Sequence, residues 1–423
     1  MTLYKKQKLL LTVSSTRVIR FLIKTPFFET LKQEYDIVFL SDLPLDKMGL
    51  GFDISIIPVP KETGVLAFCL KVLRFFRVRY SLRLHLSAFY RNDGFVWDDL
   101  LYSLNDAPPF FRTRQKLMLL RILDKLGGFI PKKILVQSAY ITLLERLKPD
   151  VVMVATPWYK VDTALGFAAE TLNKPCWVYP EGWDYPIRPA LCDYQAIFSW
   201  GPALEKDLLR INVPPQKMRR IAHPLTALRP YLPKNSEAIK QKFGIPIGSR
   251  VITMYGNATY CTGIDHQRQA LKTILEWAKD QPNILVLFRA LPYDNQWADL
   301  AYLRELETTY SCFKMRQGSG LFSDYSQDEA MQDPNEEVSD WIAITDVLVT
   351  MVSHACLEYG FCGKPVVMYD SFGRGEYIVK ELVKSGILLA KTNKDLVQGI
   401  DEVLAQRLFD PQKLLETFSF TSL

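Results

Sequence analysis

The sequence lacks any apolar run that could cross a bilayer. Membrane helices need about 18 or more consecutive apolar residues, and no segment of the 423-residue chain reaches that length. The N-terminal stretch MTLYKKQKLLLTVSSTR starts with basic residues, but its apolar run is too short for a signal sequence. We therefore expect this stretch to form a first strand and the protein to be cytoplasmic.

Closely spaced cysteine pairs are also missing. The seven cysteines are odd in number and scattered along the chain, with no C-x-x-C pair. This pattern predicts reduced thiols that pack as small hydrophobic side chains in a cytosolic protein. What is present is ordinary globular material, with 48% hydrophobic and 23% charged residues and a net charge of +6. The mild positive excess is compatible with an anionic partner.

Strand-like apolar runs alternate with helix-length segments. The first strand, KLLLTVSS, precedes a helix expected over 16–35 and then the strand DIVFLSD, and the same alternation recurs from DVVMVATP (150–157) onward. Such alternation predicts an α/β fold with mostly parallel sheets and helices on both faces.

A segment rich in proline and glycine interrupts this alternation. Residues 225–249 contain Pro230, Pro233 and Pro246, and the strand RVITMYGN follows. We predict an N-terminal domain over 1–227, a linker over 228–249, a C-terminal domain over 250–400 and a helical tail over 401–423. Two successive α/β domains would face each other across a cleft, with ligands at the carboxyl ends of the strands.

One segment concentrates polar groups at such a strand end. In DVLVTMVSHACLEYGFCGKPVVMYD (346–370), a strand ends at Ser353, which we expect to cap a helix that stops before Pro365. A helix N-terminus beside Ser353 and His354 suits a phosphate, and Glu358, one turn further, suits two ribose hydroxyls. The alternative is a capped core helix with a surface glutamate.

This pattern resembles the donor site of GT-B glycosyltransferases, and it also resembles the related sugar-nucleotide 2-epimerases and CDP-polyol phosphotransferases. VITMYGNAT resembles the first strand and loop of a GT-B C-terminal domain, and ILVLFRALP resembles a strand-Arg-Pro-His-Pro segment of surface-polysaccharide transferases. The resemblance covers roughly residues 148–370. It implies two Rossmann-like domains and a nucleotide-sugar partner, with no cofactor.

The sequence departs from these relatives at several positions. Leu291 replaces a frequent histidine, and Thr350 stands where many retaining enzymes have a first glutamate, which favours an inverting mechanism. The epimerases have Gly-Gly after the serine, whereas this chain has His354-Ala355, which disfavours that activity. No D-x-D motif occurs, so we expect no metal requirement.

Inverting transfer needs a base and positive groups for the leaving diphosphate. For the diphosphate we name Ser353 and His354, together with residues on three other loops: Gly256, Asn257, Arg289 and Arg374. For the base, YPEGWDYP (179–186) offers Asp184 as first choice and Glu181 as second. An exposed Trp183 would stack on a sugar, and Ser15 and Arg17 are candidates for acceptor binding. The alternative for residues 179–186 is a structural turn with Trp183 packed. The alternative for Arg374 is an ordinary surface charge on a loop.

Basic and aromatic residues mix in two N-terminal stretches, 71–86 and 110–133. This composition suits the surface of an anionic membrane, where a lipid-linked acceptor would lie. Packed helices with solvated basic edges are the alternative, and no nucleic-acid module is visible.

The leading hypothesis is therefore a metal-independent GT-B-like glycosyltransferase of bacterial surface-polysaccharide or glycoconjugate synthesis, peripheral at the inner membrane face. It would transfer a sugar from a nucleotide-sugar to a glycan or lipid-linked acceptor. The alternatives are a CDP-polyol phosphotransferase or an epimerase on the same fold, or a non-catalytic scaffold.

Overall fold

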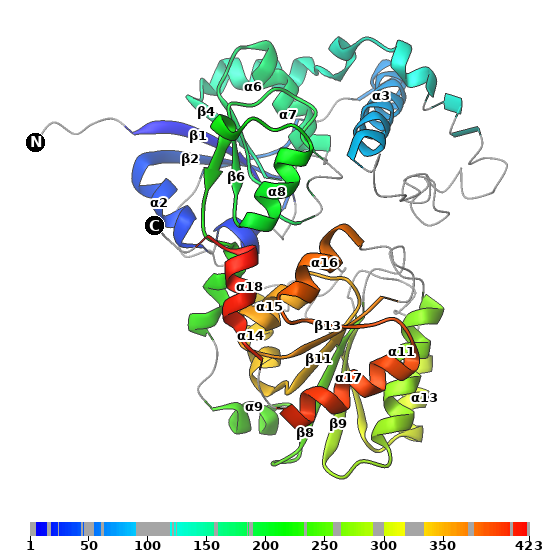
Figure 1. The fold of residues 1–423 in the computed structure, drawn as a ribbon. Helices are drawn as coiled ribbons and strands as arrows, with labels where there is room; N and C mark the ends of the chain where they lie inside the picture. The colour runs from blue at the N-terminus through cyan, green and yellow to red at the C-terminus, as the bar shows by residue number, and fades with distance from the viewer. Residues whose placement is uncertain are drawn as a thin grey trace, which may run out of the picture. The chain divides into compact units, whose positions relative to one another are not determined.

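The computed structural model divides into two compact units, Met1–Ala222 and His223–Thr421 (Figure 1). The residues that it describes are 6–14, 18–23, 25–43, 45, 55–60, 63–89, 119–120, 122–123, 125–155, 160–183, 185, 189–231, 235–256, 264–290, 300–317, 334–370, 376–406 and 409–420. The boundary between the units precedes the predicted linker, 228–249. That segment contains the end of one helix and the whole of another, both of the second unit, rather than extended chain only.

Parallel strands form the sheet of the first unit, in the order β3-β2-β1-β4-β5-β6-β7. These strands are β1 (Gln7–Thr12), β2 (Tyr35–Leu40), β3 (Ser55–Ile57), β4 (Val151–Val154), β5 (Cys176–Val178), β6 (Ala196–Ser199) and β7 (Met218–Arg220). Its α-helices are α2 (Pro26–Glu34), α3 (Val65–Phe89), α6 (Ser138–Leu147), α7 (Lys160–Thr171) and α8 (Pro202–Arg210). Short turns of other helix types are η1 (Ile19–Ile23), η4 (Gly127–Phe129), η5 (Lys132–Leu135) and η7 (Pro215–Lys217).

The sheet of the second unit is also parallel, in the order β10-β9-β8-β11-β12-β13. Its strands are β8 (Arg250–Tyr255), β9 (Ile284–Ala290), β10 (Phe313–Gln317), β11 (Val347–Thr350), β12 (Val366–Tyr369) and β13 (Leu388–Ala390). The helical segments are η8 (Pro224–Tyr231), α9 (Ser236–Lys242), α11 (Ile264–Ala278), α13 (Leu300–Thr309), α14 (Pro334–Ile344), α15 (Ala355–Phe361), α16 (Glu376–Lys384), α17 (Asn393–Gln406) and α18 (Pro411–Phe418). The prediction of α/β architecture with parallel sheets is confirmed.

One local prediction was wrong. The single helix expected over 16–35 is instead a π-turn, η1, followed by α2, because Pro26 cannot donate within a helix. Thr25 caps the new helix, accepting from the Phe28 amide at 3.3 Å. Strand β13, which was not predicted from the sequence, is the edge strand of the second sheet.

The short helix α15 is enclosed by the C-terminal part of the chain. All seven of its residues are buried, and it packs against η8 and α18. A Cβ at Gly360 would collide with Leu414 of α18, so glycine permits this close approach. The ring of Phe361 meets His223 edge-on at 5.0 Å, and the His223 amide donates to Ser419 Oγ at 3.0 Å.

His223 is held as a neutral imidazole in this packing. Its side chain is 2% exposed, and Nδ1 accepts from the Leu225 amide at 3.1 Å. Burial lowers the pKa of His223 well below its usual value, and the charge of His354 lowers it further.

We therefore predict that the second unit loses stability as pH falls. An unfolded histidine takes up a proton below about pH 6.5, whereas His223 resists protonation in the folded unit. From pH 6.5 down to the lowered pKa, the free energy of unfolding should fall by up to about 1.4 kcal/mol per pH unit on this account. Asparagine keeps an acceptor for Leu225 but does not titrate, so His223→Asn should make the decline shallower. Urea denaturation between pH 5 and 8 measures both slopes, and equal slopes would show that folded His223 accepts the proton.

Candidate functional site

The strand order of the second sheet creates one topological switch point. From β8 the chain proceeds to β9 and β10 on one side, and it then returns to place β11 on the other side of β8. The loops after β8 and β11 therefore leave the sheet in opposite directions, and ligands of open α/β sheets bind at such a point. Gly256 follows β8, and Ser353 and His354 follow β11, so three predicted donor residues lie there.

Strand register brings Arg289 to the same edge. Tyr255 pairs with Arg289 on β9 and with Thr350 on β11. The Gly256 amide donates to the Arg289 carbonyl at 2.9 Å, so this amide is used within the sheet. The absence of a side chain at Gly256 would let a phosphate approach the backbone closely, but the Gly256 N–H would not be available to bind it.

Aromatic rings hold the Arg289 side chain. Its guanidinium carbon lies 5.1 Å from the centroid of Tyr255 and 5.6 Å from that of Trp341 on α14. The two rings meet edge-to-face, and Tyr359 of α15 packs on Tyr255 in the same way at 5.5 Å. The Tyr359 hydroxyl donates to that of Tyr255 at 2.8 Å, and burial raises the pKa of Tyr359 well above its usual value. Neutral rings therefore surround a fixed positive charge.

The loop between β11 and α15 is the partly exposed portion of the predicted phosphate site. Ser353 Oγ accepts from the Ala355 amide at 3.2 Å, and the Ser353 carbonyl accepts from the Cys356 amide at 3.0 Å. The helix is assigned from Ala355, but His354 already adopts helical angles (φ −57°, ψ −22°) and makes no side-chain cap bond, so Ser353 takes the capping role expected of it. Ser353 satisfies an amide of the first turn, and both residues remain partly exposed.

Glu358 lies inside α15 rather than on the surface. Its side chain is 4% exposed, and it carries the one charge among the seven residues of that helix. The alternative of a surface glutamate on a core helix is therefore wrong. Proteins rarely bury a carboxylate without a specific partner or task.

Thr350 occupies the position of the missing first glutamate. It ends β11 and is fully buried, and within the described part of the chain its hydroxyl has no hydrogen-bond partner. The structure thus places a small neutral side chain in the core beside Tyr255, where a glutamate would be enclosed as well.

The candidate base region in the first unit is more enclosed than expected. Glu181 is 2% exposed and lies close to Tyr179, whose pKa is raised by burial and then by the Glu181 charge. Trp183 is 7% exposed, so the expectation of an exposed tryptophan was wrong. The turn is fixed to the strand that follows it, because Trp200 donates to the Pro180 carbonyl at 3.2 Å.

Five predicted site residues lie outside the described residues: Ser15, Arg17, Asp184, Asn257 and Arg374. The described part holds no cluster of three His, Cys, Asp or Glu side chains that could bind a metal ion. The absence of a metal requirement stays a prediction.

Sequence reasoning missed the polar network at the switch point of the first sheet. Asp162, in the first turn of α7, is fully buried between the ends of β1 and β4. It accepts from Thr12 Oγ1 at 2.5 Å, Ser14 Oγ at 2.6 Å and the Ala155 amide at 3.0 Å. An acidic residue in a first helical turn is common, so the sequence carried no distinctive signal for it.

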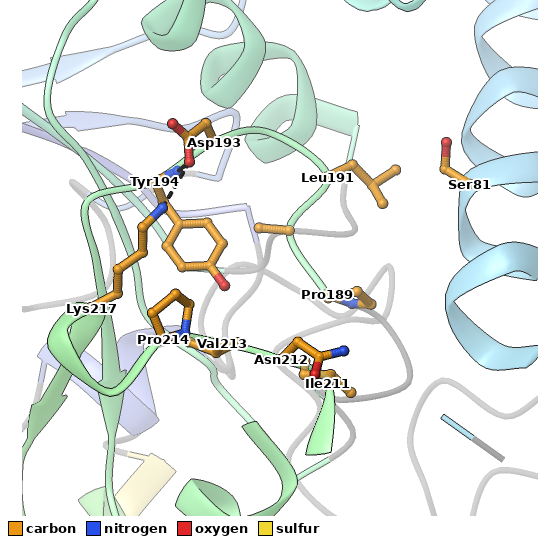
Figure 2. A pocket seen from close by; sticks show the side chains of 11 residues that line it. Ser81, Pro189, Leu191, Asp193, Tyr194, Ile211, Asn212, Val213, Pro214 and Lys217 are labelled. Carbon is orange, nitrogen blue, oxygen red and sulfur yellow. Dashed lines mark hydrogen bonds and ion pairs between the residues drawn. The ribbon is translucent and has the colours of Figure 1, made fainter. Parts of the chain in front are cut away.

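A shallow cavity in the first unit lies away from these residues (Figure 2). It encloses about 390 Å³ and is lined by Ser81 of α3 and by loops that precede β6 and β7, including the Asp193–Lys217 ion pair at 2.9 Å. These loops are at the amino ends of the strands, the edge opposite to the predicted site. The cavity is therefore not part of the predicted site.

No family model matches the chain, and no curated protein matches it in sequence. Solved structures do match. The UDP-GlcNAc 2-epimerase from Neisseria meningitidis bound to UDP-GlcNAc has a TM-score of 0.54 and 14% identity, over 98% of this chain and 95% of that one. A glycosyltransferase from Rickettsia africae gives 0.55 and 11%, over 98% and 95%. Anabaena Alr3699/HepE in complex with UDP and glucose gives 0.54 and 11%, over 98% and 96%. At these identities the likeness is one of fold: the chain has the GT-B-like, two-domain architecture that these sugar-nucleotide epimerases and glycosyltransferases share.

Proposed function

We propose that the protein is a metal-independent, inverting glycosyltransferase that uses a nucleotide-sugar donor. The acceptor would be a glycan or a lipid-linked glycan of bacterial surface-polysaccharide synthesis. The observation that carries the proposal is the arrangement at the β8–β11 switch point. The carboxyl end of the second sheet carries Arg289, which contacts aromatic rings, and the partly exposed Ser353-His354 loop. The buried Glu358 lies one turn into the helix that follows this loop.

These groups match the parts of a nucleoside diphosphate. Ser353 and His354 would donate to the diphosphate, and Arg289 would supply positive charge beside it. Glu358, within the first turn of α15, would accept from the two ribose hydroxyls. The near absence of water around a buried carboxylate would strengthen those two hydrogen bonds.

The transfer step then needs little further chemistry from the second unit. The acceptor oxygen would attack the anomeric carbon from the face opposite the diphosphate, and the bond from that carbon to the diphosphate oxygen would break. A carboxylate of the first unit would take the acceptor proton, with Asp184 as first choice and Glu181 as second. The leaving diphosphate would keep the bonding electrons and be stabilised by Arg289, His354 and Ser353.

A sugar-nucleotide 2-epimerase is the second candidate. The observation that favours it is that epimerases are among the structures that match nearly the whole chain, such as the putative UDP-N-acetylglucosamine 2-epimerase from Listeria monocytogenes at a TM-score of 0.57 and 11% identity. The His354-Ala355 pair in place of Gly-Gly speaks against it.

Product analysis separates the two candidates. The protein would be incubated with UDP-, GDP-, CMP- and CDP-linked donors, with and without a glycan acceptor. Release of UDP or GDP with a lengthened acceptor supports transfer, and a new nucleotide-sugar without release supports epimerisation. CMP release with a polyol phosphate in the product would indicate a phosphotransferase. If calorimetry detects no nucleotide binding, both enzymatic functions are excluded and a scaffold remains.

We predict that Glu358→Gln weakens UDP binding by about 10-fold or more, because a charged acceptor for two hydroxyls is replaced by a neutral amide. Calorimetry on folded protein measures the dissociation constant. The matched control is Asp346→Asn, which alters a carboxylate at the amino end of the same sheet, where it accepts from the Val251 amide at 2.7 Å. That variant should lose stability and keep its UDP affinity. Equal affinity in both variants would remove Glu358 from the site.

We predict graded effects at Arg289. Lysine keeps the charge but loses the planar stack on Tyr255 and Trp341, so Arg289→Lys should lower the transfer rate by about 10-fold. Arg289→Met removes the charge and should lower the rate by about 100-fold or more. Steady-state kinetics with the donor found above gives these values. Arg250→Met, at the amino end of β8, is the control, and a loss of similar size there would indicate a general packing effect.

A further inference from the structure

The N-terminal part of the long helix α3 is largely exposed, whereas residues 74–83 are partly buried. The helix has 25 residues, most of them apolar, yet none of its side chains that the structure describes is fully buried. Apolar helices of folded proteins normally cover a core, and exposed apolar patches mark interaction sites. In Figure 1, α3 is the long blue helix of the first unit, and it packs against η4 and η5 rather than covering a buried core.

The exposed apolar side chains follow one line of the helix. Val65 is 82% exposed, Phe68 66% and Val72 39%, at steps of three and four residues that place them on one face, and Leu73 (39%) and Leu84 (53%) are exposed beside this line. The line continues through Phe76, where Gly127 of η4 comes so close that a Cβ would collide with the Phe76 carbonyl. The exposed part of α3 is therefore followed directly by the contact with η4.

The η4 turn adds the most exposed aromatic ring to this region. Phe129 is 85% exposed, and Leu126, just before η4, is 51% exposed. Arg74 anchors this region by donating to the Ile134 carbonyl at 2.7 Å and the Val136 carbonyl at 3.3 Å. We call the surface made by Val65, Phe68, Val72, Leu126 and Phe129 the α3–η4 face.

Positive charge accompanies the α3–η4 face, and α3 contains no acidic residue. Lys71 is exposed next to Val72, and Arg79 and Arg83 continue the line of the apolar side chains by steps of three and four. The other two basic residues are Arg74 and Arg77. A second copy of the chain would bring like charges together at this face. Nucleic acid would gain little from aliphatic valine and leucine, which do not stack on bases.

We propose that the α3–η4 face binds the surface of an anionic lipid bilayer, with the apolar side chains inserted among the acyl chains and the basic residues beside the headgroups. Among the described helices, none has an apolar stretch able to cross a membrane. Helix α3 would thus lie along the interface. The proposal goes beyond the proposed transfer reaction and is tested without a donor or an acceptor.

Vesicle flotation of the full-length protein tests this surface. Vesicles of phosphatidylcholine with about one third phosphatidylglycerol should capture the protein, and pure phosphatidylcholine vesicles should capture much less. The variant Phe68→Ser with Phe129→Ser should bind at least about 10-fold more weakly, because the two largest exposed rings are lost. Ile247→Ser is the matched control, since Ile247 of the second unit is also 66% exposed, and it should bind like the unaltered protein.

Charge is tested by Lys71→Glu, because Arg74 already holds carbonyls of the η5 region. This reversal should lower binding to the anionic vesicles by about fivefold or more, and Lys413→Glu, at an exposed lysine of α18, should not. Binding to neither vesicle type, or equal binding to both, would overturn the proposal. Sedimentation that shows self-association lost in the double serine variant would instead assign the face to a second copy. Nucleotide binding by the same variants is measured in parallel. Normal nucleotide binding would show that a failure of the membrane proposal is distinct from a failure of the proposed function.

Discussion

The pairing of β11 with β8 brings the Ser353-His354 loop to the edge of the second sheet that also holds Gly256. β11 follows β10 in the chain, yet it hydrogen-bonds to β8 and not to β10. The pairing of Thr350 with Tyr255 fixes the register, and one residue of slip would turn the side chains of β11 to the opposite face. The Ser-His loop reaches the Gly256 edge because of that register. The crossover that makes it possible contains α14, whose Trp341 packs on Tyr255 at 6.1 Å.

The aromatic packing around Tyr255 connects fold stability to the candidate chemistry. Trp341 from α14 and Tyr359 from α15 both meet the Tyr255 ring edge-to-face, and Arg289 lies over two of these three rings. An arginine in water samples many rotamers, and fixing one on binding costs free energy. Rings that already hold the guanidinium remove most of that cost before a ligand arrives. The same contacts that pack two helices on the sheet thus pre-position a cation at its edge.

Sequence reasoning predicted the architecture because the signal there is local and repeated. Apolar strands such as LLLT and VLVT and the helices between them carry their own periodicity, so parallel sheets followed directly. The elements it missed are short or depend on tertiary pairing. β3 and β13 have three residues each and are defined by their neighbours Val38–Leu40 and Val367–Tyr369. Pro26 is a local signal of the opposite kind, because a proline ends or kinks a helix that would otherwise run through it.

The candidate site was predictable in part for a similar reason. Ser353, His354 and Glu358 are near one another in the chain, so a helix model could place them together. The two rings that contact Arg289 belong to Tyr255 on β8 and Trp341 on α14, which are 86 positions apart in the sequence. Their contact with Arg289 could therefore be recognised only in the three-dimensional structure. The solvent exposure of side chains could not be predicted from the sequence either. Glu181 and Trp183 belong to a segment with the composition of a surface turn, yet both are buried.

Burial changes how the Glu358 carboxylate should be understood. The seven residues of α15 are enclosed by the sheet, η8 and α18, and this enclosure depends on Gly360 and on the neutral His223 beside Phe361. A helix with no role in binding could fill this space with apolar side chains alone at lower cost, since burying a carboxylate requires compensation by hydrogen bonds or charge. Glu358 thus places a charge inside a fully buried helix, one turn from the partly exposed Ser353-His354 loop, which is the position that the proposed contact with ribose hydroxyls requires.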